Sequence, residues 1–245
     1  FYFGHLNEAA FLSALAATLP AGAKTVDVGG NFGLYAVHAA YVGGSAARVV
    51  AFEPLPSARG LLKRNCTENG LGGRIIVRPE AVSDEKGKAV FHAAIEGAFS
   101  GLHDTGRSPI GHAFETETIA LDACNEVAEL GPVDFFKIDV EGHEAGVMIG
   151  ARQLIARSPN ILISLEYSHK NLTADARLAI LGEIDSHLKA GFRAWVLDDD
   201  SEVLPLRAVD QVSSCLSGTL VLAAPGCDWA DDLLAAVSQH APWFN

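Results

Sequence analysis

Cysteine is scarce in this sequence, and its few copies are widely separated. The four cysteines are Cys66, Cys124, Cys215 and Cys227, and no two of them form a Cys-x-x-Cys pair. This spacing argues against a zinc ribbon and a disulfide-rich scaffold, and it favours reduced thiols in a cytoplasmic protein. The chain begins at Phe1 rather than Met, which leaves open a targeting segment upstream.

Basic residues are also in deficit, and long hydrophobic runs are missing. Lys and Arg total 18 against 30 Asp and Glu, which gives a formal net charge of −12. Because an acidic surface repels phosphate backbones and anionic lipids, we expect no nucleic-acid partner. The longest apolar runs, such as residues 219–224, are far shorter than the roughly 20 residues that a membrane-spanning helix needs. We therefore expect a soluble protein without a membrane span.

The sequence does contain a regular alternation of short apolar runs and segments of helical period. Seven runs predict strands, at residues 25–28, 48–52, 74–77, 133–138, 161–165, 192–197 and 219–223. Strands that alternate with helices predict an α/β fold with a mostly parallel seven-stranded sheet and helices on both faces. The last two runs flank an irregular polar stretch, residues 198–218, so we expect them to form an antiparallel hairpin at one end of the sheet.

We expect a single Rossmann-like domain over residues 23–225. A leading helical segment, residues 1–22, precedes this domain, and a C-terminal helical tail, residues 226–245, follows it. Residues 84–120 interrupt the rhythm with repeated glycines and alternating segments, which predicts an inserted β-rich ribbon or lid. The sequence does not indicate the oligomeric state.

The first predicted strand leads into a glycine-rich turn that is typical of a nucleotide site. This turn carries Asp27, Gly29, Gly30, Asn31 and Gly33 directly before a helix. Glycines let the backbone approach a ligand, and a helix N-terminus attracts an anionic group. The spacing fails the Gly-x-Gly-x-x-Gly pattern of dinucleotide sites in either register, and the acid suits a cofactor with an ammonium and a sulfonium. A plain turn with Asp27 as a helix-capping acid is the alternative.

Two further segments fit the same cofactor. Glu53 ends the second predicted strand, where a carboxylate can accept both ribose hydroxyls. After the third strand, Val82 could pack against an adenine, and Ser83 or Asp84 could bind its exocyclic amine. An ordinary surface acid and ordinary turn chemistry are the alternatives for these two segments.

A second motif combines a buried strand with several acids. Residues 133–138 are followed by Asp139, Glu141, His143 and Glu144. Acids favour a helix N-terminus for dipole reasons alone, which is the alternative explanation for Glu141 and Glu144. Asp139 lies at the end of a central strand, where open α/β sheets bind ligands.

Together these motifs resemble those of the FkbM-type methyltransferases, which have the class I S-adenosylmethionine-dependent fold. The resemblance spans about residues 21–225. It rests on the segments 27–33, 52–56, 81–84, 121–122 and 136–144 and on Asn65 and Asn69. Gly30 and His143 stand where the family more often has alanine. The resemblance implies O-methylation of a hydroxyl on a sugar, glycan or natural-product scaffold. It also implies that Glu53 lies at the ribose, that the glycine-rich turn lies at the methionine end, and that Pro54 belongs to the cofactor site.

An alcohol is a weak nucleophile, so a base or a metal ion should assist the transfer. Strand-end placement nominates Asp139, Glu141 and His143, together with Glu166 and His169 after the next strand. Asp139 and Glu166 could instead bind magnesium, so the metal requirement is open. A nucleotide-dependent oxidoreductase and a non-catalytic cofactor-binding partner protein are the alternative functions. The acceptor cannot be read from the sequence.

Overall fold

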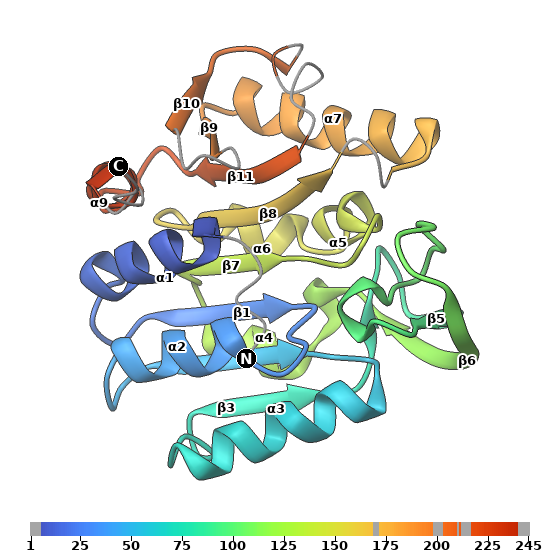
Figure 1. Ribbon diagram of the computed structural model, residues 1–245. Coiled ribbons are helices and arrows are strands. Elements are labelled where there is room, and N and C mark those ends of the chain that lie inside the picture. Colours follow the sequence, from blue (N-terminus) through green and yellow to red (C-terminus); the bar gives the residue numbers. More distant parts are fainter. Residues whose placement is uncertain (1–5, 169–171, 198–202, 210, 212–216, 240–245) are drawn as a thin grey trace, which may run out of the picture.

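The computed structural model describes residues 6–168, 172–197, 203–209, 211 and 217–239 (Figure 1). Its centre is an eight-stranded sheet in the order β10-β9-β11-β8-β7-β1-β2-β3. The strands are β1 (Lys24–Val28), β2 (Arg48–Phe52), β3 (Ile75–Arg78), β7 (Phe135–Ile138), β8 (Leu162–Ser168), β9 (Arg193–Leu197), β10 (Val203–Leu206) and β11 (Ser217–Ala223). Strands β8, β7, β1, β2 and β3 are parallel to one another. In contrast, β11 is antiparallel to β8 and β9, and β10 is antiparallel to β9. The expected mostly parallel α/β fold is confirmed.

The expectation of seven strands was wrong by one strand. β10 lies in the stretch that we expected to be irregular, and it pairs with β9 at the edge of the sheet. Its sequence includes Pro205, which cannot donate a ladder hydrogen bond and is tolerated at a sheet edge. β9 and β11 are antiparallel neighbours as expected, but β11 lies inside the sheet between β8 and β9.

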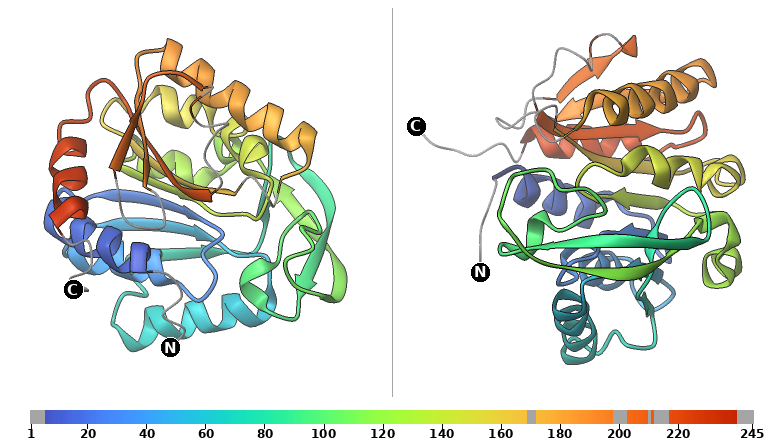
Figure 2. Two further views of the ribbon diagram at one scale, coloured as in Figure 1. Left: turned by 45° about the horizontal axis from the view of Figure 1, so that its top comes forward. Right: turned by 90° about the vertical axis from the view of Figure 1, so that its right-hand side faces the viewer.

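Helices cover both faces of the sheet (Figures 1 and 2). One face packs against α1 (Leu6–Thr18), α2 (Leu34–Val42), α3 (Pro56–Glu68) and α9 (Ala230–Gln239), and the other against α4 (Asn125–Leu130), α5 (Glu144–Ile149), α6 (Arg152–Ala156) and α7 (Ala174–Lys189). Consecutive residues of the central strand β7 point to opposite faces of the sheet. Phe135 packs in the core under the first group of helices, and Phe136 packs in the core under the second group. No described helix is both long and apolar enough to span a bilayer.

Residues 144–156 do not form one continuous helix. They form α5 and α6, with Gly150 between them. A Cβ atom at Gly150 would lie 2.1 Å from the carbonyl oxygen of Ser83, so the close approach of these two segments requires glycine.

The inserted ribbon is a second, three-stranded sheet at the carboxyl ends of the central strands (Figure 2). It contains β4 (Ala81–Val82), β5 (Gly87–Ala94) and β6 (Ile110–Ile119), and β5 and β6 are antiparallel. A 3-10 helix, Gly97–Phe99, lies in the connection between β5 and β6. After β3 the chain order reverses, because β7 joins the opposite side of β1. The insertion therefore faces the switch point where such sheets bind ligands.

Candidate active site

The turn after β1 adopts backbone conformations that explain its glycines. Gly29 has φ 76° and Gly33 has φ 95°, and a Cβ atom at Gly29 would lie 1.7 Å from the carbonyl oxygen of Asp139. Asn31 also has a positive φ, 47°, which asparagine tolerates better than most residues. The amides of Gly29 and Gly30 both donate to the carbonyl oxygen of Phe52. The turn is thus held tightly between the ends of β2 and β7.

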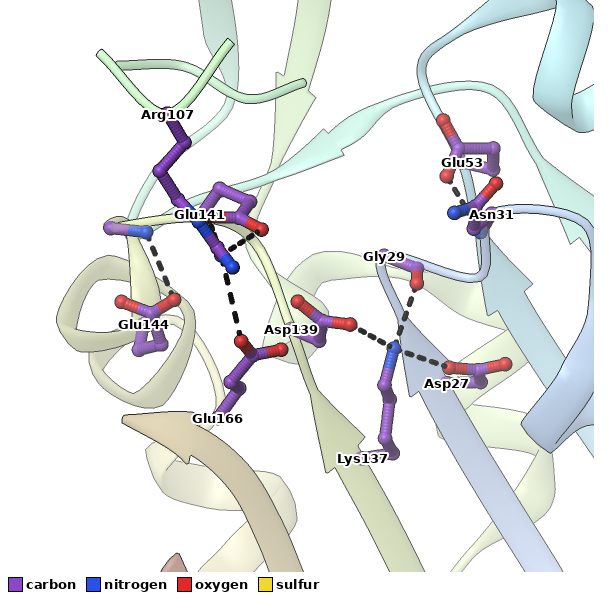
Figure 3. Close-up of polar contacts among 11 residues, drawn as sticks. Asp27, Gly29, Asn31, Glu53, Arg107, Lys137, Asp139, Glu141, Glu144 and Glu166 are labelled. Atoms are coloured by element: carbon purple, nitrogen blue, oxygen red, sulfur yellow. Dashed lines mark hydrogen bonds and ion pairs between the residues drawn. The ribbon is translucent and has the colours of Figure 1, made fainter. Parts of the chain in front are cut away.

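Glu53 closes one side of this turn. Its Oε2 accepts from the Asn31 amide at 2.8 Å (Figure 3). Its Oε1 accepts from the Leu55 amide at 2.7 Å. Burial raises the pKa of Glu53 to about 7, although the two backbone donors act in the opposite direction. Each carboxylate oxygen can accept a further hydrogen bond, so the pair of oxygens can still receive a diol.

A cleft of about 560 Å³, partly open to solvent, lies between the sheet edge and the insertion. Seven residues singled out from the sequence line it, namely Gly29, Asn31, Glu53, Pro54, Val82, Asp139 and His143. The remaining lining residues are Val28, Phe52, Glu80, Ala81, Phe91, Gly97, Ala98, Ser100, Gly101, Leu102 and Val140. Asp27, Gly30, Gly33, Ser83, Glu141 and Glu166 are not in the lining, and His169 lies outside the described residues.

Asp27 lies beneath the turn and faces a buried lysine. Its carboxylate is fully buried, and among the described residues its oxygens have no hydrogen-bond partner. The Lys137 ammonium lies 3.7 Å from Asp27 Oδ1 and 3.1 Å from Asp139 Oδ2, and it donates to the Gly29 carbonyl oxygen at 2.8 Å (Figure 3). Burial raises the pKa of Asp27, and the Lys137 charge opposes that rise.

A second group of acids lies around Arg107, which comes from the insertion. Arg107 Nη1 donates to both carboxylate oxygens of Glu141, at 2.9 and 3.0 Å, and lies 3.7 Å from Glu166 Oε1 (Figure 3). Its guanidinium also stacks on Phe99, 4.1 Å from the ring centroid. Glu141 has φ 53°, a strained conformation for glutamate that turns its carboxylate toward this arginine.

The acids of this group do not titrate alike. The Asp139 charge, followed by burial, raises the pKa of Glu166 well above its usual range, and the two side chains are hydrogen bonded. Because 45% of the Glu166 side chain is exposed, the neighbouring charge is the main cause. The Asp139 charge therefore favours the protonated form of Glu166. Burial raises the pKa of Glu141 to about 6 and that of Glu144 to about 7. Glu144 accepts from the Gly142 amide and helps to shape the segment after β7.

His143 lies apart from these acids. Its Nε2 is 2.9 Å from Ser83 Oγ, and its Nδ1 is 3.2 Å from His103 Nε2. Ser83 donates its hydroxyl proton to Asp84, so it must accept from His143, which assigns the imidazole proton to Nε2. Burial, together with His103, lowers the pKa of His143, which favours the uncharged ring.

Three residues of this region had no role in the sequence interpretation. Lys137 was identified as part of a motif only, yet a lysine inside a buried apolar strand requires acidic partners. Asp139, two residues later, could have been recognised as such a partner, since alternate residues of a strand lie on the same face. Arg107 and His103 come from the insertion and reach partners 34 and 40 residues away, and no local pattern indicates such contacts.

The described residues include no group of three or more His, Cys, Asp or Glu side chains placed to hold a metal ion. The sheet order and the turn beneath the cleft are those of an α/β domain of the class I methyltransferase type. The chain belongs to the FkbM methyltransferase family, because the model of the methyltransferase FkbM domain matches residues 27–194. A search of curated proteins gave no match.

Solved structures share this fold at low sequence identity. The O-methyltransferase from Bacillus cereus in complex with SAH is 15% identical with a TM-score of 0.53, over 90% of this chain and 81% of that one. TomG from Streptomyces achromogenes, an O-methyltransferase in complex with SAM, is 11% identical with a TM-score of 0.50, over 89% and 79% of the chains. The methyltransferase FkbM from Methylobacillus flagellatus KT is 16% identical with a TM-score of 0.50 over 82% of this chain, which spans 43% of the length of that protein.

Proposed function

We propose that this protein is an S-adenosylmethionine-dependent O-methyltransferase that acts on a hydroxyl of a sugar, a glycan or a natural-product scaffold. The observation that carries the proposal is the Gly29–Asn31 turn, joined to the Glu53 carboxylate at the edge of the cleft. Membership of the family supports methyl transfer. The SAH and SAM complexes of the two O-methyltransferases support the cofactor and the choice of oxygen as acceptor atom.

The residues around the cleft fit the chemistry of this cofactor. Glu53 has acceptor capacity for the two ribose hydroxyls, and Pro54 and Val82 offer apolar contacts. The buried negative charge of Asp27 and the adjacent Asp139 favour a cationic ligand above the turn. The Ser83 hydroxyl is hydrogen bonded to Asp84 and to His143. Of these residues only His143 lines the cleft, so any effect of Ser83 on adenine would act through His143.

When bound, the cofactor supplies a methyl group attached to a positively charged sulfur. The protein mainly has to align the acceptor hydroxyl with it, and it has to remove the hydroxyl proton. Asp139 is placed for the second task, because it lines the cleft and 31% of its side chain is exposed. The Asp139 charge favours the protonated form of Glu166, and neither Glu166 nor Glu141 lines the cleft, so Asp139 is the better placed base.

The test begins with calorimetric titration of S-adenosylmethionine, S-adenosylhomocysteine and NAD. We expect saturable binding of the first two ligands and none of NAD. Binding of NAD alone would favour the oxidoreductase alternative. Transfer is then followed with ¹³C-methyl-labelled cofactor and a panel of hydroxylated sugars and natural products, since NMR distinguishes an O-methyl from an N-methyl product. N-methylation would refute the oxygen acceptor, and cofactor binding without transfer to any panel compound would favour the non-catalytic alternative.

A further inference from the structure

Lys137 is the most heavily engaged cation of the site, although no part of the proposed chemistry uses it. It lies in β7, in the middle of the sheet, and 7% of the residue is exposed. Lysine is almost never buried unless it is paired, because removing an ammonium from water is costly. A buried lysine at a ligand site therefore needs a physical reason.

The surroundings of the Lys137 ammonium supply that reason. An ammonium has three hydrogen atoms to donate, and two oxygen atoms lie within hydrogen-bond distance of it, while a third lies at ion-pair distance. They are the Gly29 carbonyl oxygen at 2.8 Å, Asp139 Oδ2 at 3.1 Å and Asp27 Oδ1 at 3.7 Å. The remaining side is covered by the face of Tyr35, whose ring centroid is 5.3 Å away. The ammonium thus contacts two carboxylates, one backbone carbonyl and one aromatic ring.

The three oxygen partners belong to different parts of the site. Gly29 forms the turn under the cleft, Asp139 lines the cleft from the end of β7, and Asp27 belongs to β1 beneath the turn. Strand register explains the convergence, because Asp27 and Lys137 are direct neighbours on β1 and β7. The same lysine therefore fixes the cofactor turn and the candidate base relative to each other.

We propose that Lys137 is a positioning residue, which holds the Gly29 turn and the Asp139 carboxylate in the single relative geometry that cofactor binding needs. The proposal rests on the proposed function, since it concerns the same cofactor. Without the ammonium, Asp27 and Asp139 would face each other with no cation between them, and the Gly29 carbonyl would lose its donor. The Asp139 carboxylate would then be free to turn away from the cleft.

The test is a double-mutant cycle on S-adenosylmethionine affinity, measured by calorimetry. It uses Lys137→Met, Asp139→Asn and the double variant. We expect Lys137→Met to weaken binding about 10- to 100-fold, as for the loss of a charge-assisted hydrogen bond. In the Asp139→Asn background the same replacement should cost at least threefold less, because groups in one network are not additive.

The matched control is Arg74→Met. Arg74 is also a partly buried cation that anchors backbone carbonyls, those of Ala40 and Gly44, but it precedes β3 at the opposite end of the sheet. Urea unfolding measures how much each variant is destabilised. At a loss of stability equal to that of Lys137→Met, we expect Arg74→Met to bind S-adenosylmethionine within twofold of the unmodified protein. An equal loss of affinity in this control would mean that Lys137 supports only the fold.

The remaining outcomes separate this inference from the proposed function. Binding by Lys137→Met within twofold of the unmodified protein, or full additivity with Asp139→Asn, overturns the positioning role while the function stands. Failure of the unmodified protein to bind refutes the function and takes this inference with it. If Lys137→Met does not fold, Lys137→Gln replaces it in the cycle, because Gln keeps a donor for Gly29 and lacks the charge. We expect Lys137→Arg to bind S-adenosylmethionine more tightly than Lys137→Gln, because Arg restores the positive charge. The reverse order of affinities contradicts the proposal.

Discussion

Replacement of Glu53 by Gln tests the cofactor half of the site directly. The carboxylate is 6% exposed and already accepts from Asn31 and Leu55, so its remaining lone pairs are fixed in direction. Gln keeps one acceptor oxygen and loses the charge, which removes one charge-assisted hydrogen bond to the ribose. Such a bond contributes about 1.5–3 kcal/mol, so affinity for S-adenosylmethionine should fall about 10- to 150-fold.

The pH dependence of binding sharpens this prediction. The pKa of Glu53 is raised to about 7, so the acceptor form exists above that pH and is lost as the pH falls through it. Between pH 8 and pH 6 the ionised fraction falls to about one tenth, and the affinity should weaken by about tenfold. Glu53→Gln should lack this component of the pH dependence.

The control for the loss of a buried glutamate is Glu183→Gln on α7. That glutamate is buried and paired with Arg152, far from the cleft, and its replacement should leave the binding curve unchanged. Calorimetry from pH 5.5 to pH 8.5 measures all three proteins. Identical pH profiles for the unmodified protein and Glu53→Gln would refute the assignment of Glu53 to the ribose, whatever the affinities are.

Three further predictions concern the insertion, the chemistry and stability. Arg107→Ala should release residues 96–112, with thermolysin cleavage there about 5- to 30-fold faster because the buried Glu141 loses its partner; an unchanged rate would argue against a lid. Asp139→Asn should reduce turnover by roughly 10²- to 10⁴-fold and chelator should have no effect, whereas loss with chelator and recovery with magnesium would indicate metal. The pKa of Glu144 is raised to about 7, so the fold favours its protonated form and stability falls as pH rises from about 4.5 to 7. Glu144→Gln should abolish up to about 3 kcal/mol of this fall in the free energy of unfolding, measured with urea. Parallel curves of unfolding free energy against pH for the two proteins would contradict this prediction.

The placement of the glycine-rich turn beside Glu53 was predictable because its signals are local. The residues from Asp27 to Gly33 are contiguous, and backbone geometry alone requires glycine at Gly29. Glu53 follows the next strand, and parallel neighbouring strands bring their carboxyl ends together. Periodicity likewise predicted the parallel strands β1, β2, β3, β7 and β8, since each contains a short apolar run.

The other half could not be read in this way. The sequence nominated Glu141 and Glu166 as separate candidates, but what they do depends on Arg107, which lies 34 residues from Glu141 in a segment without a motif. Their pKa values depend on three-dimensional proximity to Asp139 as well. Edge strand β10 was missed for a related reason, because it forms by pairing with β9 and its own sequence has no clear strand pattern.

This division has a consequence for specificity. The residues of the glycine-rich turn lie at strand ends and are fixed by the sheet, whereas the insertion lines the cleft with Gly97, Ala98, Ser100, Gly101 and Leu102. Loops can change sequence without disturbing the core that carries them. We therefore expect residues 84–120 to select the acceptor and the ends of the sheet strands to bind the cofactor. Exchange of this segment with that of another family member should change the acceptor and leave S-adenosylmethionine affinity within a few fold, and loss of cofactor binding in a folded chimera would contradict the division.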